Sequence, residues 1–215
     1  MFTGIVQELA EVVVCDREPG MLRLGLALSA ARREHLKGGA SVAVNGICLT
    51  VARQEPAGIG FDVIEETLQR TSLAGVQLGD RVNVERSATF ADEIGGHRVS
   101  GHVSGVARIL EVRRSPNNQV IRLGSDDAEW FRHLFHKGYV ALDGASLTIS
   151  ALERSERWFE VSLIPETLAR TTFGFRDEGD AVNVEVDAET QAVVETVERL
   201  FADPQWRSRM SAAAS

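Results

Sequence analysis

The sequence predicts a mainly β protein, built from two tandem, duplicated, six-stranded Greek-key β-barrels with short helices and a C-terminal α-helix. Three observations lead to this fold class. The chain of 215 residues repeats itself with a period near 98 residues, and the apolar residues of each half come in short runs bounded by turn signals. The end of the chain instead has apolar residues at helical spacing. Two barrels of about a hundred residues each are ordinary domain sizes.

The internal repeat sets the domain boundaries. Three blocks return in the same order at offsets of 98, 100 and 100 residues: VAVNGICLTV (42–51) as VALDGASLTI (140–149), ETLQRT (66–71) as ETLART (166–171), and GDRVNVE (79–85) as GDAVNVE (179–185). A weaker match relates FTGIV (2–6) to VSGHV (99–103). We therefore expect a first barrel over 1–96, a second over 97–187 and a separate tail over 188–215.

Turn dipeptides place the strands within each half. Asn45-Gly46 and Asp143-Gly144 predict tight hairpin turns, because these residue types tolerate positive φ angles. In the first half the expected strands are Val6–Val14, Leu22–Leu28, Val42–Val44, a strand from Cys48, Gly60–Ile64 and Arg81–Val84, with counterparts in the second half. The expected short helical segments are Ala30–Leu36, Asp127–His136, Glu66–Arg70 and Glu166–Arg170.

The tail predicts a helix over Asp187–Phe201, with Asp187 as its N-cap. Its apolar positions are Ala192, Val193, Val197, Leu200 and Phe201. Such a stripe, outside both repeats, either docks on a barrel core or joins copies of the chain. Residues 203–215 are expected to fray, apart from Trp206.

Composition limits the kinds of partner. The chain has 31 acidic and 23 basic residues, a formal net charge of −8, and no Lys/Arg cluster, which disfavours nucleic acid and anionic membranes. No apolar run approaches a membrane span and the start lacks secretory features, so we expect a cytoplasmic protein. Two cysteines and no paired metal-ligand spacing predict neither a disulfide framework nor a metal site. The expected partner is a small molecule.

The repeated hairpins also carry candidate chemistry. Residues i and i+2 of a strand share a face, so Cys48 lies with Thr50, and Ser146 with Thr148. Each pair offers small polar groups beside strand backbone, which can hydrogen-bond the edge of a flat heterocycle. The alternative is that these are ordinary strand residues after a hairpin.

The two copies differ where chemistry is expected. Ile5 is replaced by His102, Cys48 by Ser146, and Gly39 by Lys137. One pocket thus gains groups capable of proton transfer, while the other holds a thiol that could act as a nucleophile. This pattern fits two molecules of one ligand in different roles, although a lone histidine is also common as a structural residue.

Carboxylates and hydroxyls recur near the predicted short helices. Asp62, Glu66 and Thr67, with Glu166 and Thr167, would suit a polyol tail, or would cap helices. The second half has two more residues between Phe159 and Glu166 than the first has between Phe61 and Glu66, so we expect the pocket depths to differ.

Long motifs then point to a family. They are MFTGIV, NGICLTV, DEIGGH, SGHV, LDGASLTI, LIPETLARTT and VNVEVDAETQAVVETVERL. Over nearly its full length the chain resembles the riboflavin synthases with two lumazine-binding barrels. The resemblance implies a cofactor-free transferase that dismutates two 6,7-dimethyl-8-ribityllumazine molecules to riboflavin and 5-amino-6-ribitylaminouracil. It also implies a homotrimer formed by the helix at 188–201, with lumazine synthase as a candidate partner. Each active site would lie between the first barrel of one subunit and the second barrel of its neighbour.

The resemblance assigns residues to two lumazine sites. The first set is Gly4, Ile5, Val6, Cys48, Leu49, Thr50, Asp62, Val63, Ile64, Glu65, Glu66 and Thr67. The second set is Gly101, His102, Val103, Lys137, Ser146, Leu147, Thr148, Ser162, Leu163, Ile164, Pro165, Glu166 and Thr167.

Catalytic roles follow as hypotheses. His102, helped by Ser146 or Thr148, assists removal of a proton from the C7 methyl group of one lumazine. Cys48 or an activated water adds to the other ring, and Glu185 orients groups or shuttles protons.

Two other function classes fit the same barrels, because fold alone does not fix function. One is a non-catalytic lumazine or flavin carrier of the antenna-protein type, expected to bind one ligand per chain rather than two. The other is an interaction module that binds no small ligand.

Overall fold

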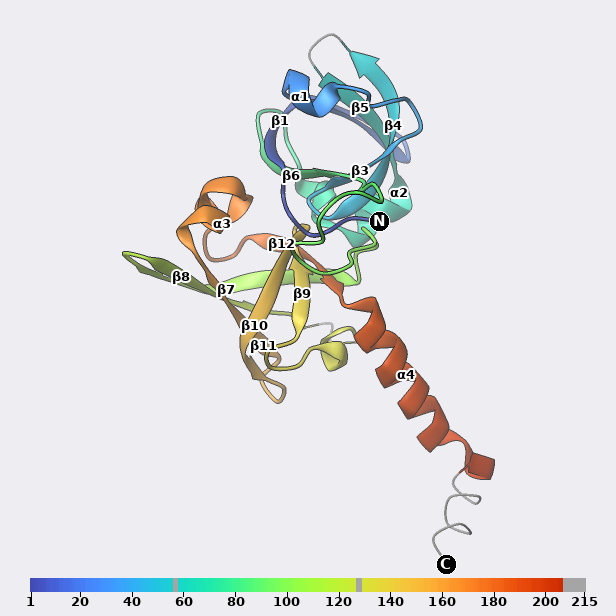
Figure 1. The fold of residues 1–215 in the computed structure, drawn as a ribbon, viewed down its shortest axis with the longest axis vertical. Coiled ribbons are helices and arrows are strands. Elements are labelled where there is room, and N and C mark those ends of the chain that lie inside the picture. The colour runs from blue at the N-terminus through green and yellow to red at the C-terminus, as the bar shows by residue number, and fades with distance from the viewer. Residues whose placement is uncertain (56–57, 127–128, 207–215) are drawn as a thin grey trace, which may run out of the picture.

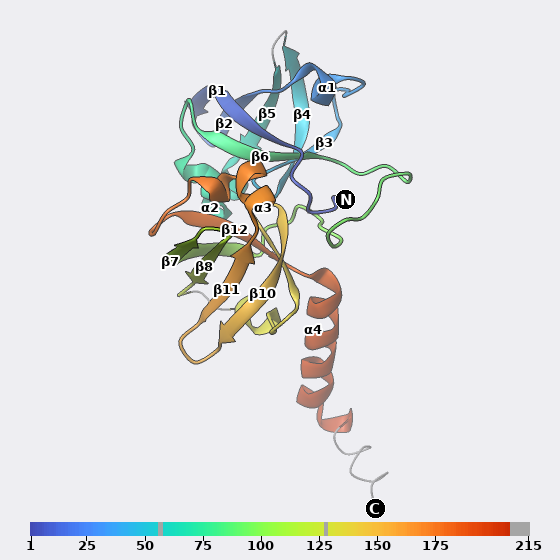
Figure 2. The same ribbon diagram turned by 60° about the vertical axis from the view of Figure 1, so that its left-hand side comes forward.

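The computed structural model describes residues 1–55, 58–126 and 129–206. Its strands form two closed antiparallel barrels of six strands each. The barrels are stacked on one another, and the C-terminal helix leaves the second barrel and points away from both (Figures 1 and 2). The predicted fold class is therefore confirmed.

The first barrel has the strand order β1-β2-β5-β4-β3-β6, and β6 closes it by pairing with β1. Three consecutive strands, β3 to β5, pair in turn, and β2 lies beside β5, which is the Greek-key arrangement. Its elements are β1 (Glu8–Glu18), β2 (Met21–Ala27), α1 (Ala30–Arg33), β3 (Ser41–Val44), β4 (Ile47–Glu55), β5 (Gly58–Ile64), α2 (Glu65–Arg70), the 3-10 helix η1 (Ser72–Gly75) and β6 (Arg81–Arg86).

The second barrel has the equivalent order, β10-β11-β8-β7-β12-β9. Its elements are β7 (Gly105–Ser115), β8 (Asn118–Gly124), the 3-10 helix η2 (Phe131–His133), β9 (Tyr139–Leu142), β10 (Ala145–Glu153), β11 (Trp158–Leu163), α3 (Pro165–Arg170), the 3-10 helix η3 (Thr172–Gly174) and β12 (Ala181–Val186). Each barrel encloses its own apolar core, because the inward residues of its strands alternate with outward, more polar ones.

The hairpin turns of β3–β4 and β9–β10 lie back to back. Asn45 and Asp143 have φ angles of 44° and 43°, as predicted for these turns. A Cβ atom built on Gly46 would lie 2.6 Å from the amide nitrogen of Gly144, so only glycine permits this approach. The two barrels therefore meet at the turns that precede the candidate residues Cys48 and Ser146.

Crossed hydrogen bonds fix this contact. The Asn83 side chain donates to the Asp143 carbonyl at 2.9 Å, and the Asn183 side chain donates to the Asn45 carbonyl at 2.8 Å. These amides are buried, and the two bonds obey the pseudo-twofold symmetry of the repeat. The barrels thus have one defined relative position.

Two sequence expectations need correction. A helix was expected over Asp127–His136, but only Phe131–His133 is helical in its described part, and 127–128 lie outside the described residues. Trp130, Phe131 and Leu134 pack into the second core, and this packing decides the local conformation. The helix expected over Ala30–Leu36 likewise ends at Arg33.

The two extra residues of the second half were also misplaced. β4 pairs with β5 at Val51 and Phe61, whereas β10 pairs with β11 at Ile149 and Val161. Phe61 therefore corresponds to Val161 and not to Phe159. Two residues separate β4 from β5 and four separate β10 from β11, so the insertion lies in the hairpin turn, away from the candidate pockets.

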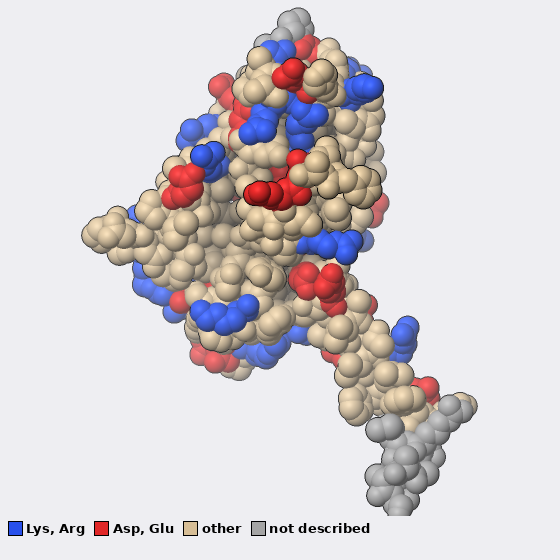
Figure 3. Space-filling view, in the orientation of Figure 1, with Lys and Arg blue, Asp and Glu red and all other residues tan. Residues whose placement is uncertain are grey.

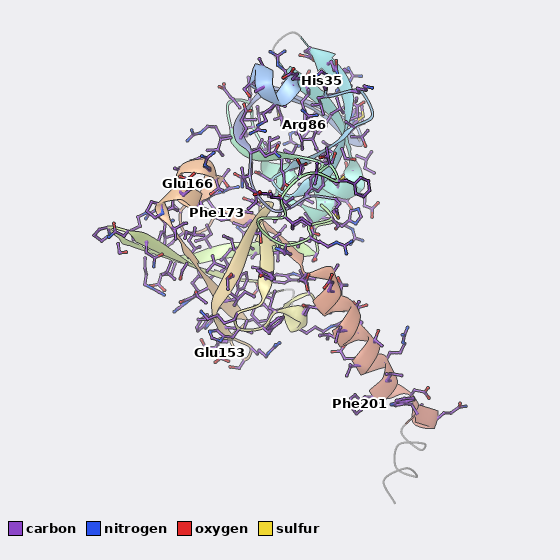
Figure 4. All side chains as sticks on the ribbon, in the orientation of Figure 1. His35, Arg86, Glu153, Glu166, Phe173 and Phe201 are labelled. Atoms are coloured by element: carbon purple, nitrogen blue, oxygen red, sulfur yellow. The ribbon has the colours of Figure 1, made fainter. Side chains whose placement is uncertain are left out.

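The C-terminal helix α4 (Ala188–Ala202) begins as predicted. Asp187 caps it by accepting a 2.9 Å hydrogen bond from the backbone nitrogen of Thr190. None of its residues is buried, and Phe201 projects near its far end, remote from the barrels (Figure 4). The first of the two interpretations of its apolar stripe, docking on a barrel core, is therefore wrong within a single chain.

Charges of both signs are interspersed over the barrels on the face shown in Figure 3, whereas α4 shows mostly uncharged surface. Among the described helices, none is both long and apolar enough to cross a membrane.

Candidate functional site

Each barrel presents the predicted pair of polar side chains on the outside of its wall. Cys48 and Ser146 are half-buried, and Thr50 and Thr148 are exposed. The residues between them point into the barrel cores, as period-two alternation requires. The prediction that Cys48 shares a face with Thr50, and Ser146 with Thr148, is confirmed.

The neighbouring strand adds matching groups in each copy. Since β4 and β5 pair at Val51 and Phe61, the outward residues Thr50 and Asp62 lie on adjacent strands. Asp62 accepts a 2.7 Å hydrogen bond from Arg53. The same register, from Ile149 to Val161, brings Thr148 beside Ser162.

Two isoleucines extend these faces where the strands end: Ile64 is the last residue of β5, and Ile164 directly follows β11. Ile64 and Ile164 are 57% and 60% exposed, although each is large and apolar. They directly precede α2 and α3. Each face thus combines small polar groups with an exposed aliphatic side chain, a combination suited to a flat heterocycle with a polar edge.

The peptides 2–6 and 99–103 cross over between the barrels. Ser146 donates its backbone N–H to the Gly4 carbonyl at 2.8 Å, and Cys48 donates to the Gly101 carbonyl at 2.9 Å. Val6 belongs to the core of the second barrel, and Val103 packs against that of the first. The expected grouping of Gly4 and Ile5 with Cys48 therefore needs correction, because these residues lie with Ser146. In the same way, Gly101 and His102 lie with Cys48 and not with Ser146.

Close packing explains the glycines in these peptides. Gly4 and Gly101 have φ angles of +76° and +83°. A Cβ atom would lie 2.5 Å from the Ser146 Cβ in one case and 2.6 Å from the Cys48 Cβ in the other. At the centre of the exchange, Phe2 and Val99 form an antiparallel bridge between the two peptides.

Buried glutamates hold the crossed peptides in place. One Glu185 oxygen accepts from the Ser100 nitrogen at 2.6 Å and from its hydroxyl at 2.7 Å, and the other accepts from the Gly101 nitrogen at 2.9 Å. Glu85 makes the same three bonds to Thr3 and Gly4. Burial raises the pKa of both carboxyl groups above the ordinary value, while these hydrogen bonds oppose the shift.

Lys137 lies at the edge of the second face. Its φ is 66°, and its nitrogen donates to the Ile149 carbonyl at 2.9 Å, as the nitrogen of Gly39 donates to the Val51 carbonyl at 2.8 Å. This equivalence confirms the alignment of Gly39 with Lys137. A lysine held in a left-handed conformation, where the first copy has glycine, is an exception to steric preference.

Sequence reasoning missed two residues of the second face, His97 and Tyr139. His97 is buried, its Nδ1 lies 2.6 Å from the Ser146 Oγ, and its ring stacks on Tyr139 with centroids 5.2 Å apart. Tyr139 pairs with Thr148 across the strands. The only sequence signal was the Gly95-Gly96 pair before the histidine, which permits close approach of the linker.

Some predicted binding residues turn their side chains into the cores. These are Val6, Leu49, Val63, Leu147 and Leu163. They can meet a ligand on the outer face only through their backbone atoms.

The short helices are not capped by the predicted carboxylates. Ile64 and Ile164 occupy the N-cap positions of α2 and α3 without a side-chain hydrogen bond. The Glu66 Oε1 lies 3.6 Å from the Arg70 Nε, and Glu166 forms an ion pair with Arg170. Glu65, Pro165 and Glu166 are exposed and Thr67 and Thr167 are half-buried, so the capping interpretation is wrong and these groups stay accessible. Within the described ranges no three His, Cys, Asp or Glu residues are grouped to hold a metal ion.

Known proteins share this architecture. Residues 3–87 and 100–187 each match the lumazine binding domain family. The chain is 44% identical over 202 residues to riboflavin synthase of Escherichia coli (strain K12), covering 94% of both chains. It is 42% identical over 202 residues to riboflavin synthase of Chlamydia pneumoniae, covering 94% of this chain and 98% of the relative.

A solved structure, LumP complexed with 6,7-dimethyl-8-(1'-D-ribityl) lumazine, superposes with a TM-score of 0.78 and 22% identity. The match covers 86% of this chain and 99% of LumP. At this identity the likeness concerns the fold of two barrels. The family matches to both halves and the identity to curated relatives over nearly the whole chain decide the assignment: this chain, with its two lumazine binding domains, belongs to the riboflavin synthase family.

Proposed function

We propose that the chain is a riboflavin synthase, a transferase that converts two molecules of 6,7-dimethyl-8-ribityllumazine into riboflavin and 5-amino-6-ribitylaminouracil. The observation that carries the proposal is the pair of equivalent outer faces in one chain, which differ at Cys48 and Ser146. Two like faces suit two copies of one substrate, and their unequal polar groups suit a donor and an acceptor.

The residue sets support a pteridine with a ribityl chain. Thr50 and Thr148, with the backbone of the neighbouring residues, offer hydrogen bonds to the heterocycle edge, while Ile64 and Ile164 offer apolar contact to its face. The exposed groups at the starts of α2 and α3 would bind the ribityl hydroxyls.

The two faces are open, so we propose that a neighbouring subunit covers them. The first face of one chain would meet the second face of another in a homotrimer, and two stacked lumazines would react within one complex rather than by dilute encounter. The exposed Val193, Val197 and Phe201 stand at positions i, i+4 and i+8 of α4 and would form the contact between subunits.

This arrangement gives His102 its partners. Within one chain His102 belongs with the Cys48 face, and its side chain is exposed. Across the proposed interface it would approach Ser146 and Thr148 of the neighbouring chain. An imidazole there can take a proton from the C7 methyl group of one lumazine, giving the carbanion that attacks the other.

The other catalytic hypotheses are refined by the contacts. Cys48 packs against the apolar cluster of Phe2, Ala43, Val99 and Ala141, which favours water over the thiol as the nucleophile that adds to the acceptor ring. All three Glu185 hydrogen bonds go to the peptide that carries His102. We therefore assign Glu185 a positioning role rather than proton transfer.

The test is direct. Purified protein mixed with 6,7-dimethyl-8-ribityllumazine should form one riboflavin for every two lumazines consumed, without added cofactor. Tight binding of one lumazine per chain with no turnover would instead identify a carrier. Indifference of lumazine fluorescence to the protein would identify an interaction module. A cytoplasmic location and an association with lumazine synthase accompany this proposal as family expectations.

A further inference from the structure

The linker between the barrels brings a buried histidine onto the second face. Gly96 makes this possible: a Cβ atom at this position would lie 2.4 Å from the Thr3 carbonyl oxygen and 2.6 Å from the Ser146 Cβ. His97, the next residue, is 7% exposed and lies with its Nδ1 2.6 Å from the Ser146 Oγ. On the first face the residue equivalent to Ser146 is Cys48, which has no hydroxyl to orient.

The ring of His97 has a fixed orientation. It is nearly parallel to the Tyr139 ring, with an interplanar angle of 11°. Among the described residues its Nε2 is buried without a hydrogen-bond partner. The ring therefore presents Nδ1, and not Nε2, to the site.

The protonation state follows from this environment. Burial lowers the pKa of His97, more strongly than Asp187 raises it, so the imidazole is neutral at neutral pH. A neutral imidazole carries one N–H, and burying an unpartnered N–H is less favourable than burying an unpartnered acceptor nitrogen. The proton therefore belongs on Nδ1, where it can be donated to Ser146.

We propose that His97 is a positioning residue of the second face: its Nδ1–H donates to the Ser146 Oγ, which directs the Ser146 O–H away from His97 and leaves it as a donor to the bound ligand. A lumazine offers ring nitrogens and carbonyl oxygens as acceptors for this hydroxyl. The inference rests on the proposed function, because it takes Ser146 as a contact of that substrate. It adds a direction to the hydrogen bond, and it makes the two lumazine sites chemically unequal.

Two substitutions of His97 separate positioning from packing. An Asn amide can replace the ring Nδ1, whereas a Gln amide reaches the position of Nε2. We expect His97→Gln to weaken lumazine binding at one of the two sites by about five- to tenfold, the size of one lost hydrogen bond. His97→Asn should lose clearly less. In a Ser146→Ala background, His97→Gln should cause no further loss.

A spectroscopic readout on the unaltered protein tests the direction of the bond. Nitrogen NMR of protein labelled with 15N-histidine should show, for the His97 ring, a protonated Nδ1 and an unprotonated Nε2 at neutral pH. That signal should be absent from His97→Asn.

Protonation of Nε2 instead, or equal losses in the Asn and Gln variants that persist without Ser146, would overturn the inference. Riboflavin formation by the unaltered protein would still support the proposed function in that case. Absence of riboflavin formation, together with an Nδ1-protonated ring and the expected difference in lumazine binding between the Gln and Asn variants, would overturn the proposed function and still support the His97 assignment.

Discussion

Arg176 donates a 2.9 Å hydrogen bond from Nη2 to Oδ2 of Asp143, whose side chain is completely buried. The first barrel has Asn45 and Val76 at the corresponding positions, so a buried ion pair in one copy corresponds to a neutral pair in the other. Burial of the carboxyl raises the pKa of Asp143, and Arg176 opposes this shift.

Removing one partner of this pair should be far more harmful than removing both. Arg176→Val leaves the buried carboxylate unpaired and should cost about 3–5 kcal/mol of unfolding free energy. Asp143→Asn combined with Arg176→Val copies the first barrel and should recover most of that loss. Urea unfolding of the three proteins measures both, and equal stability of the single and double variants would contradict the argument.

Substitution of Glu185 tests how the His102 peptide is held. Glu185→Gln places an amide N–H against a peptide N–H, so we expect a loss of about 1–3 kcal/mol of stability. We also expect slower riboflavin formation, because the peptide carrying His102 loses its fixed position. Ser100→Ala keeps both peptide N–H bonds to Glu185 and removes the hydroxyl, which donates to Glu185 and accepts from the His102 nitrogen at 3.1 Å. It is the matched control, with a smaller effect expected in both chemical unfolding and turnover.

His102 is exposed, so its replacement tests chemistry with little effect on folding. We expect His102→Gln to lower kcat by about a hundredfold, the usual contribution of one acid–base group, with the melting temperature unchanged. Steady-state assays and calorimetry check both. Full turnover in an intact oligomer would remove the histidine from the mechanism.

The helix α4 should decide assembly without deciding the fold of the barrels. Val197→Asp puts a charge into the exposed stripe of Val193, Val197 and Phe201, so we expect dissociation into monomers and loss of riboflavin formation. Gln191→Asp adds the same charge on the opposite side of the helix from Val193 and should preserve the oligomer. Sedimentation velocity distinguishes the two, and a monomeric active Val197→Asp protein would contradict the proposed interface.

Two buried histidines should make stability depend on pH. Burial lowers the pKa of His97 and His133 below the ordinary 6.5. The unfolded chain therefore binds protons first as the pH falls, and the stabilisation present above pH 6.5 is lost towards the folded pKa values. Glu85 and Glu185, with raised pKa, act with opposite sign at lower pH.

The histidine contribution is measured by difference. The free energy of unfolding should fall from pH 8 to pH 6 more steeply in the natural protein than in a His133→Gln variant. Parallel curves would show that this histidine keeps the same affinity for protons in both states.

Much of the fold could be predicted because its signals are local. The hairpins are predicted by the turn residues Asn45 and Asp143 and by the alternating strands after them. The start of α4 is predicted by Asp187. The exchange that pairs Gly4 with Ser146 could not be predicted, since the partner of an isolated backbone group is set by the pseudo-twofold contact of the barrels. The misalignment of Phe61 with Phe159 has a similar cause: only strand pairing shows where an insertion lies.

His97 shows the same limit at the site. A single histidine in a linker has no period and no repeated counterpart, so the motif DEIGGH with its two glycines indicates neither the burial of His97 nor its contact with Ser146. Its importance appears only when Gly96 brings the backbone against Ser146.

The crossing of the peptides 2–6 and 99–103 makes the two barrels interdependent. A barrel produced alone would lose the peptide that binds its own Cys48 or Ser146, because that peptide belongs to the other half of the chain. It would keep its own peptide, which would have no partner to bind. Two identical barrels would restore both contacts by exchanging these peptides around a true twofold axis. Gene duplication would then have preserved, inside one polypeptide, the exchange of peptides between two identical subunits. Later divergence at Cys48 and Ser146 would give each barrel a different role.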